Sequence, residues 1–156
     1  MKYLLAALLF VTFAPMSEAV EQAFPKTEVG AKEIKTLPAA RWIATSREGD
    51  YFANSDRLFR PLFDYIKERD IAMTTPVEAE MRPGRMLFFI GESAAGKTVE
   101  DSGEVRAGKR PERTVASIGA RGGYNRANFR DAANELRDWL EAHPDYEAVG
   151  DPRGVF

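Results

Sequence analysis

The chain has 156 residues, a formal net charge of −2 and no cysteine. The lack of cysteine excludes disulfide bonds, thiolate-ligated iron, iron–sulfur clusters and zinc sites built on cysteine. A charge this close to neutral gives no reason to expect nucleic acid as a partner. Stability must therefore come from packing and not from disulfides, and a chain of this length can bury a sizeable core.

The first 19 residues have the pattern of a secretory signal peptide. Lys2 supplies a positive end, residues 4–13 are apolar except for Thr12, and Ser17-Glu18-Ala19 places small residues at positions −3 and −1 of a cleavage site. The apolar run is shorter than the roughly 20 residues of a spanning helix, and no later stretch could span a membrane. We expect cleavage after Ala19, a single domain over residues 20–156, and a periplasmic or secreted location. A retained N-terminal anchor is the alternative.

The first half of the domain is predicted to contain a strand, a helix and a hairpin. Residues 41–45 are typical of a strand, and the apolar spacing predicts a helix from Ser55 to Arg69 capped by Asn54 or Ser55. Pro61 should kink this helix or delay its start, because it lacks a backbone donor. Residues 73–81 and 86–90 then form a hairpin through a turn that contains Pro and Gly.

The second half repeats this order after a long polar segment. Residues 91–112 are predicted to be an exposed loop with one short strand near Val105. A strand over residues 113–118 follows, and then a helix over residues 126–142 that is capped by Asn125 and stopped by Pro144. One more strand is expected over residues 146–149.

The two halves look like copies of one unit. Gly49 and Gly122 each precede a helix and are 73 positions apart, while the helix ends are 74 positions apart. A strand-like run comes before each helix. The sequence therefore predicts an α+β domain made of a duplicated β-α-β-β unit, although a match this short could also arise by chance.

The first helix carries two apolar stripes where a surface helix needs one, about 100° wide. The first stripe comprises Leu58, Leu62 and Tyr65, and the second comprises Phe59, Phe63 and Ile66. Two interpretations remain open. Either the helix is buried over a broad face, or one stripe packs on the sheet while the other lines a ligand groove. Arg60 and Lys67 beside the second stripe could pair with anionic groups or simply keep the outer face solvated.

A nucleotide-binding pattern occurs in the long loop, but its context argues against that function. Residues 91–98 fit G-x-x-x-x-G-K-[ST], with Lys97 and Thr98 in the phosphate and magnesium positions. A phosphate-binding loop must open a helix, and the residues after Thr98 have no helical period. We therefore expect no nucleotide site here.

Candidates for metal binding and catalysis are few. His143 is the only histidine, and its place at a helix end suits a favourable interaction with the helix dipole. It is a weak candidate for an iron ligand, so the metal ligand stays unknown. Met73 is another possible weak ligand, although methionine more often packs in a core. No pair of carboxylates stands out as acid and base, so no catalytic residue and no enzymatic activity are expected.

Several of these motifs together resemble the SOUL haem-binding protein family. The motifs are Ala40-Arg41-Trp42-Ile43-Ala44-Thr45, Leu62-Phe63-Asp64-Tyr65-Ile66, Ile71-Ala72-Met73-Thr74-Thr75-Pro76-Val77 and Gly122-Gly123-Tyr124. The resemblance covers residues 28–156, and the Met-Thr-Thr-Pro-Val element is its most specific part. It implies duplicated β-α-β-β units that form a twisted, barrel-like antiparallel sheet flanked by two helices. Family members usually have a further strand after the position of Phe156, so the final strand is expected to be missing.

The resemblance also implies a function. Members are described as binding haem or other tetrapyrroles non-covalently in a hydrophobic cleft beside the first helix. We therefore expect an exported tetrapyrrole-binding protein. Its cofactor-binding residues are expected to be Phe59, Arg60, Phe63, Ile66, Lys67 and Met73. The alternative is an effector-binding or protein-interaction module of the same fold without haem, in which an open sheet edge receives a partner strand or a second copy as a homodimer.

Overall fold

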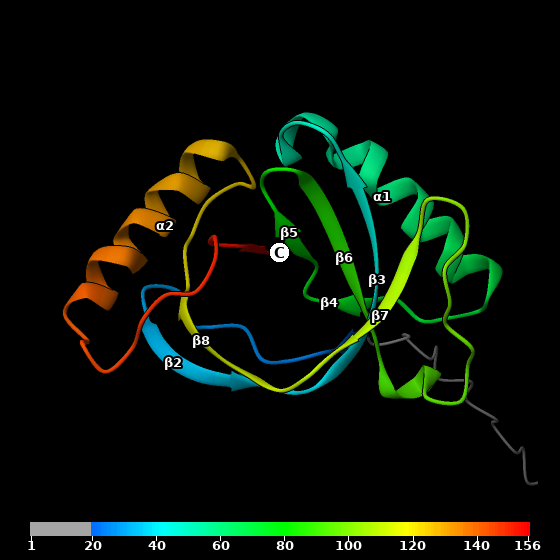
Figure 1. The fold of residues 1–156 in the computed structure, drawn as a ribbon, viewed down its shortest axis with the longest axis horizontal. Coiled ribbons are helices and arrows are strands. Elements are labelled where there is room, and N and C mark those ends of the chain that lie inside the picture. The colour runs from blue at the N-terminus through cyan, green and yellow to red at the C-terminus, as the bar shows by residue number, and fades with distance from the viewer. Residues whose placement is uncertain (1–19) are drawn as a thin grey trace, which may run out of the picture.

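A computed structural model describes residues 20–156 of the chain, so the predicted signal peptide at 1–19 lies outside the described residues. Two helices, two antiparallel sheets and one parallel pair of strands make up the domain (Figure 1). The elements in chain order are β1 Glu21–Gln22, β2 Lys32–Leu37, β3 Ala40–Arg47, α1 Tyr51–Glu68, β4 Thr74–Thr75, β5 Glu78–Glu80, β6 Gly84–Ile90, β7 Arg106–Arg110, β8 Arg113–Ile118, α2 Arg126–Glu141 and β9 Gly154–Val155, with a short 3-10 turn over Glu92–Ala94.

The main sheet has five strands in the order β7-β3-β6-β5-β9, and all its neighbouring strands are antiparallel. A separate antiparallel pair joins β2 to β8, and β1 pairs with β4 in parallel. The predicted α+β class with two helices and antiparallel sheets is confirmed. Within residues 20–156 the two antiparallel sheets do not join into a closed barrel.

Alternate residues of β3 face the two sides of the main sheet, as the period of a strand requires. Ile43 packs against α1, and the hydroxyl of Thr45 donates to the carbonyl of Leu58 at 2.7 Å. Trp42 and Ala44 face the opposite side, where the β2–β8 pair lies. The main sheet is thus covered by α1 on one face and by β2 and β8 on the other (Figure 1).

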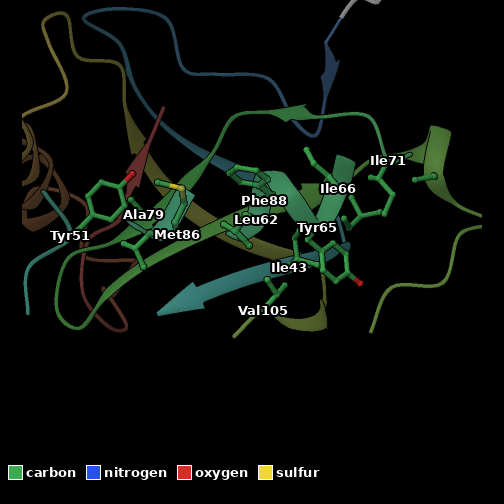
Figure 2. Close-up of a cluster of buried hydrophobic side chains, with 13 residues drawn as sticks. Ile43, Tyr51, Leu62, Tyr65, Ile66, Ile71, Ala79, Met86, Phe88 and Val105 are labelled. Carbon is green, nitrogen blue, oxygen red and sulfur yellow. The ribbon is translucent and has the colours of Figure 1, made fainter. Parts of the chain in front are cut away.

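The larger core lies between α1 and the main sheet. Figure 2 shows it extending from Tyr51 and Met86 at one end to Tyr65 and Ile71 at the other, with Leu62 and Phe88 between them. Leu62 is completely buried and Phe88 almost so. At about 25 cal/mol per Å² of apolar area, burying such side chains provides most of the driving force for this packing.

Helix α1 begins earlier than the sequence pattern predicted. Its N-cap is Asp50, whose carboxylate accepts from the backbone N–H of Phe52 at 3.0 Å, so the predicted caps Asn54 and Ser55 lie inside the first turns. Tyr51, seven residues before Leu58 on the same stripe, is buried and explains the earlier start. The helix continues through Pro61, which removes one backbone donor without ending it.

The predicted hairpin is present, but its first strand is divided. Of the two segments of this first strand, β5 pairs with β6, whereas β4 pairs with β1. Pro76 lies between the two segments, and a proline cannot donate to a sheet ladder, which explains the break. The hydroxyl of Thr74 donates to the carbonyl of Phe89 at 2.6 Å and holds β4 against β6.

The second half of the chain agrees with the pattern in its helix and differs around it. Asn125 caps α2 through the N–H of Asn128, as predicted. The segment 91–112 contains a longer strand than expected, β7. The strand predicted over 146–149 is wrong, because Val149 is almost fully exposed and the chain pairs later, through β9. Phe156 provides the anchor there by packing against the rings of Tyr51 and Tyr124.

Strand pairing supports the predicted duplication. Leu37 in β2 lies opposite Arg113 in β8, and Arg110 in β7 lies opposite Ala40 in β3. Adding 73 positions to Leu37 and Ala40 gives Arg110 and Arg113, so the two pairs have the same register. The strand before each unit therefore pairs with the first strand of the other unit, which is difficult to explain without an internal repeat.

Candidate functional site

The second apolar stripe of α1 forms a partly exposed aromatic surface. The rings of Phe59 and Phe63 stack with centroids 5.6 Å apart, and Phe59 also meets Phe88 of β6 edge to face at 5.5 Å. Phe63 is 41% exposed. We call Phe59 and Phe63, with the exposed cations Arg60 and Lys67 beside them, the α1 patch. It offers a flat apolar face with positive charge at its border.

The other two predicted binding residues lie elsewhere. Ile66 is buried in the main core, and Met73 packs against that core from the segment after α1. The structure therefore brings Phe59 and Phe63 together on the surface and places Ile66 and Met73 beneath it as packing residues.

The two cavities with described linings lie between α2 and the turn that joins β5 to β6, near the first turn of α1. Their volumes are about 260 Å³ and 340 Å³, and they share Met81, Arg82, Phe129 and Pro152. We call the pair the α2 cleft. Its remaining lining residues are Asp50, Phe52, Glu80, Arg126, Arg130, Ala133, Asn134, Arg137, Asp151 and Arg153.

Arginine dominates the charge of the α2 cleft. Arg126 contacts the Asp50 carboxylate at 2.7 Å, and Arg82 contacts it at 3.8 Å. Burial disfavours the charged form of Asp50, but the hydrogen bonds from Arg126 and from the N–H of Phe52 outweigh it and keep the Asp50 pKa below its usual value. Arg130 and Arg137 lie further along the same side of α2.

A buried carboxylate joins the cleft to the interior of the sheet. Glu78 on β5 is 2% exposed and contacts three arginines, Arg110 at 2.9 Å, Arg113 at 2.6 Å and Arg153 at 2.6 Å. The three arginines come from β7, β8 and the segment before β9. We call Glu78 and these three arginines the Glu78 cluster. Such a cluster fixes the relative positions of four segments that are distant in sequence.

The electrostatics of Glu78 are set by opposing effects. Burial alone would raise the pKa of its carboxyl, because a low-dielectric surrounding penalises the charged form. The charges of Arg110 and Arg113 and their hydrogen bonds act in the other direction, and the net result is a lowered pKa. Glu78 is thus ionised at neutral pH and cannot serve as a proton donor.

The nucleotide-like loop at 91–98 is occupied by the protein itself. The Lys97 amine donates to the carbonyl of Arg69 and pairs with the carboxylate of Asp70. The Glu21 carboxylate accepts from the N–H groups of Glu92 and Ser93. No long helix follows the loop, in agreement with the sequence argument against a nucleotide site.

No metal site is apparent in the described part of the chain. His143 lies just beyond α2, with Nδ1 2.8 Å from the carbonyl of Trp139 and its ring against the Trp139 ring. Residues 20–156 contain no group of three or more metal-binding side chains. No helix among these residues has the length and apolar character needed to span a membrane.

The sequence analysis missed both the α2 cleft and the Glu78 cluster. For the cleft a signal existed, because Arg126, Arg130 and Arg137 are spaced by four and seven residues and must share one side of a helix. For the cluster no signal existed. Nothing in the local pattern around Glu78 distinguishes it from a solvated strand residue, and its partners are 32 to 75 positions away.

Comparisons with known proteins identify a family and a fold. The family profile described as SOUL heme-binding protein matches residues 19–153. A solved structure, "Cryo-EM structure of EcmrR-DNA complex in EcmrR-RPo", contains a chain that aligns with 79% of this one at a TM-score of 0.60 and 15% identity. The present chain spans about half of that chain, 48%, and at this identity the likeness shows the fold alone. No curated protein matches the sequence at a significant level.

Proposed function

Because the chain belongs to the SOUL family of haem-binding proteins, we propose that it binds haem or a related tetrapyrrole non-covalently on the α1 patch. The observation that carries the proposal is the stacked pair formed by the partly buried Phe59 and the exposed Phe63 in a member of this family. A flat macrocycle can lie on such a pair and bury apolar area worth roughly 25 cal/mol per Å². Arg60 and Lys67 are placed to pair with its propionates.

The proposed protein acts by binding and not by catalysis. The family is a binding family by its description. Glu78 and Asp50 each pair with more than one arginine, and both have lowered pKa values, which suits ion pairing better than proton transfer. We also propose export with cleavage after Ala19. The N-terminal residue of the protein recovered from a Gram-negative periplasm should then be Val20, and recovery of an intact Met1 would contradict it.

A hemin titration tests the proposal directly. Residues 20–156 should give a saturable shift of the Soret band. Phe63→Asp should weaken binding by more than tenfold, because it places a charge against the macrocycle. Tyr146→Asp is the matched control, since Tyr146 is an aromatic residue of similar exposure, 47%, outside the α1 patch. Equal affinity of the two variants for hemin would show that the ligand does not bind on the α1 patch.

A second candidate function has its own observation, the unpaired edge of β8. In the first unit β6 pairs with both β3 and β5. In the second unit the counterpart of β3 is β8, which pairs only with β2 among residues 20–156. Strand β9 pairs with β5 of the first unit and not with β8. The repeat therefore leaves room for a strand that pairs with β8. We propose, as the alternative, an interaction module that receives such a strand from a partner or a second copy.

Size-exclusion chromatography separates the two candidates. An interaction module should elute as a dimer or complex and should show no Soret shift with hemin. A monomer that binds hemin tightly would contradict it. DNA, which the EcmrR complex contains, is not proposed as a partner of this chain, because the net charge of −2 gives no electrostatic footprint for nucleic acid.

A further inference from the structure

The α2 cleft combines an apolar floor with a rim of arginines. We propose that it is a second binding site, for the carboxylate-bearing edge of a flat apolar molecule. The proposal concerns a different surface from the α1 patch. Only the identity of the biological ligand, a tetrapyrrole with free propionates, rests on the proposed function.

The floor of the cleft is apolar and comes from four segments. Phe52 at the start of α1 and Phe129 on α2 have ring centroids 6.3 Å apart. Met81, Ala133 and Pro152 complete this surface. Five apolar residues that line a hollow between a helix and a turn suit a ring system better than they suit water or a small inorganic anion.

The rim carries more positive charge than its acidic groups neutralise. In the smaller cavity the lining includes four arginines, Arg82, Arg126, Arg130 and Arg137, against the single carboxylate of Asp50. Asp50 already engages Arg82 and Arg126. Two further arginines therefore remain for a ligand.

Arg130 and Arg137 are the available pair. Among residues 20–156, the only carboxylate that pairs with Arg130 is its helix neighbour Asp131, at 3.5 Å, and the side chains of Arg130 and Asp131 are both about 70% exposed. Arg137 donates to the amide oxygen of Asn134 at 3.1 Å. Neither contact approaches the geometry of a bidentate pair between arginine and carboxylate, so a ligand carboxylate would improve on both.

The two proposed sites can be tested separately. Phe52 and Phe63 lie on one stripe of α1, but they are eleven positions apart, a rise of about 16 Å along the helix. Substitutions that far apart with no shared partner act independently. A change in the α2 cleft should therefore leave the α1 patch intact.

The test uses a pair of fluorescent probes that need no assumption about tetrapyrroles. Pyrenebutyrate carries one carboxylate on a flat apolar body, and pyrenebutanol is its neutral counterpart. The chain 20–156 should bind pyrenebutyrate at least tenfold more tightly, and added salt should reduce the difference. The double variant R130E/R137E should remove the preference, while R121E, an exposed arginine outside the cleft, should keep it.

A steric variant tests the α2 cleft in a second way, without changing its charge. Ala133→Trp should fill the cleft and weaken binding of both probes, whereas Ala127→Trp, exposed on the same helix and outside the lining, should not. Equal binding of the two probes, or equal affinity of R130E/R137E and R121E, would overturn the proposal. Hemin binding that is lost in Phe63→Asp but unchanged in R130E/R137E would also overturn the tetrapyrrole assignment while leaving the α1 patch as the haem site.

Discussion

Glu78 is a buried carboxylate that connects four segments of the domain. Removing its charge leaves Arg110, Arg113 and Arg153 gathered around a neutral group, and uncompensated charges of this kind are costly. We expect Glu78→Gln to lower the free energy of unfolding by about 3 kcal/mol, measured by urea denaturation. Glu104→Gln is the control, because Glu104 pairs with Arg47 on the exposed surface. A Glu78→Gln variant as stable as this control would show that the cluster contributes no net stability.

Glu78 should also make the free energy of unfolding depend on pH. The folded pKa of Glu78 is lower than its ordinary value of 4.5, so the unfolded chain takes up a proton first as the pH falls. The contribution is complete well above pH 4.5 and is lost as the pH falls through the folded pKa. Unfolding free energies of wild type and Glu78→Gln, measured between pH 7 and pH 3, should therefore converge. A gap that stays constant or widens towards low pH would contradict this.

His143 should have little part in ligand affinity. It lies at the end of α2, beside Trp139, and not on the α1 patch. We expect His143→Ala to change hemin affinity by less than tenfold. Loss of the Soret shift in this variant, with circular dichroism unchanged, would make His143 the iron ligand.

At the scale of single elements, the start of α1 depends on one cap. The Asp50 carboxylate satisfies a backbone donor of the first turn and also reaches Arg126 at the start of α2. Asp50→Ala should cost about 1 kcal/mol of unfolding free energy, a typical loss for an N-cap. Asp50→Asn keeps the capping oxygen and should cost less. If thermal melts show the two variants to be equal, the ion pair matters more than the cap.

Helices α1 and α2 differ in how the sequence pattern relates to burial. In α1 the stripe of Leu58, Leu62 and Tyr65 is buried as the helical period predicts. In α2 a similar stripe exists, but every one of its residues stays partly exposed. The period shows which side of a helix faces the protein, but the extent of its burial depends on what the rest of the fold places there.

For the molecule as a whole, this difference predicts unequal stability of the two halves. Helix α1 contributes five buried residues, and α2 contributes none. Local opening should therefore expose the amides of α2 more readily. In hydrogen exchange followed by mass spectrometry, peptides from α2 should exchange faster than peptides from α1. Equal protection would mean that α2 opens only with the entire domain.

The helices, the hairpin and the repeat could be predicted from the sequence because they depend on local chemistry. Asn125 caps α2 through a contact only three residues away, and the spacing of apolar residues favours a helix without reference to distant partners. The strand at 146–149 was wrong for the complementary reason. Strands need a neighbour, and the partner of β5 is found several residues later, where Phe156 can pack against Tyr51.

The amino-acid sequence by itself determined the α+β class, the internal repeat and the family, because each is written in short-range patterns of residues. It also brought out Phe59 and Phe63 as neighbours on one helical stripe. Only the tertiary structure decided that Ile66 faces the core, that Glu78 is buried among three arginines, and that Phe52 meets Phe129 across a cleft. These contacts join segments far apart in the chain, and their energies depend on burial and on convergence of charge.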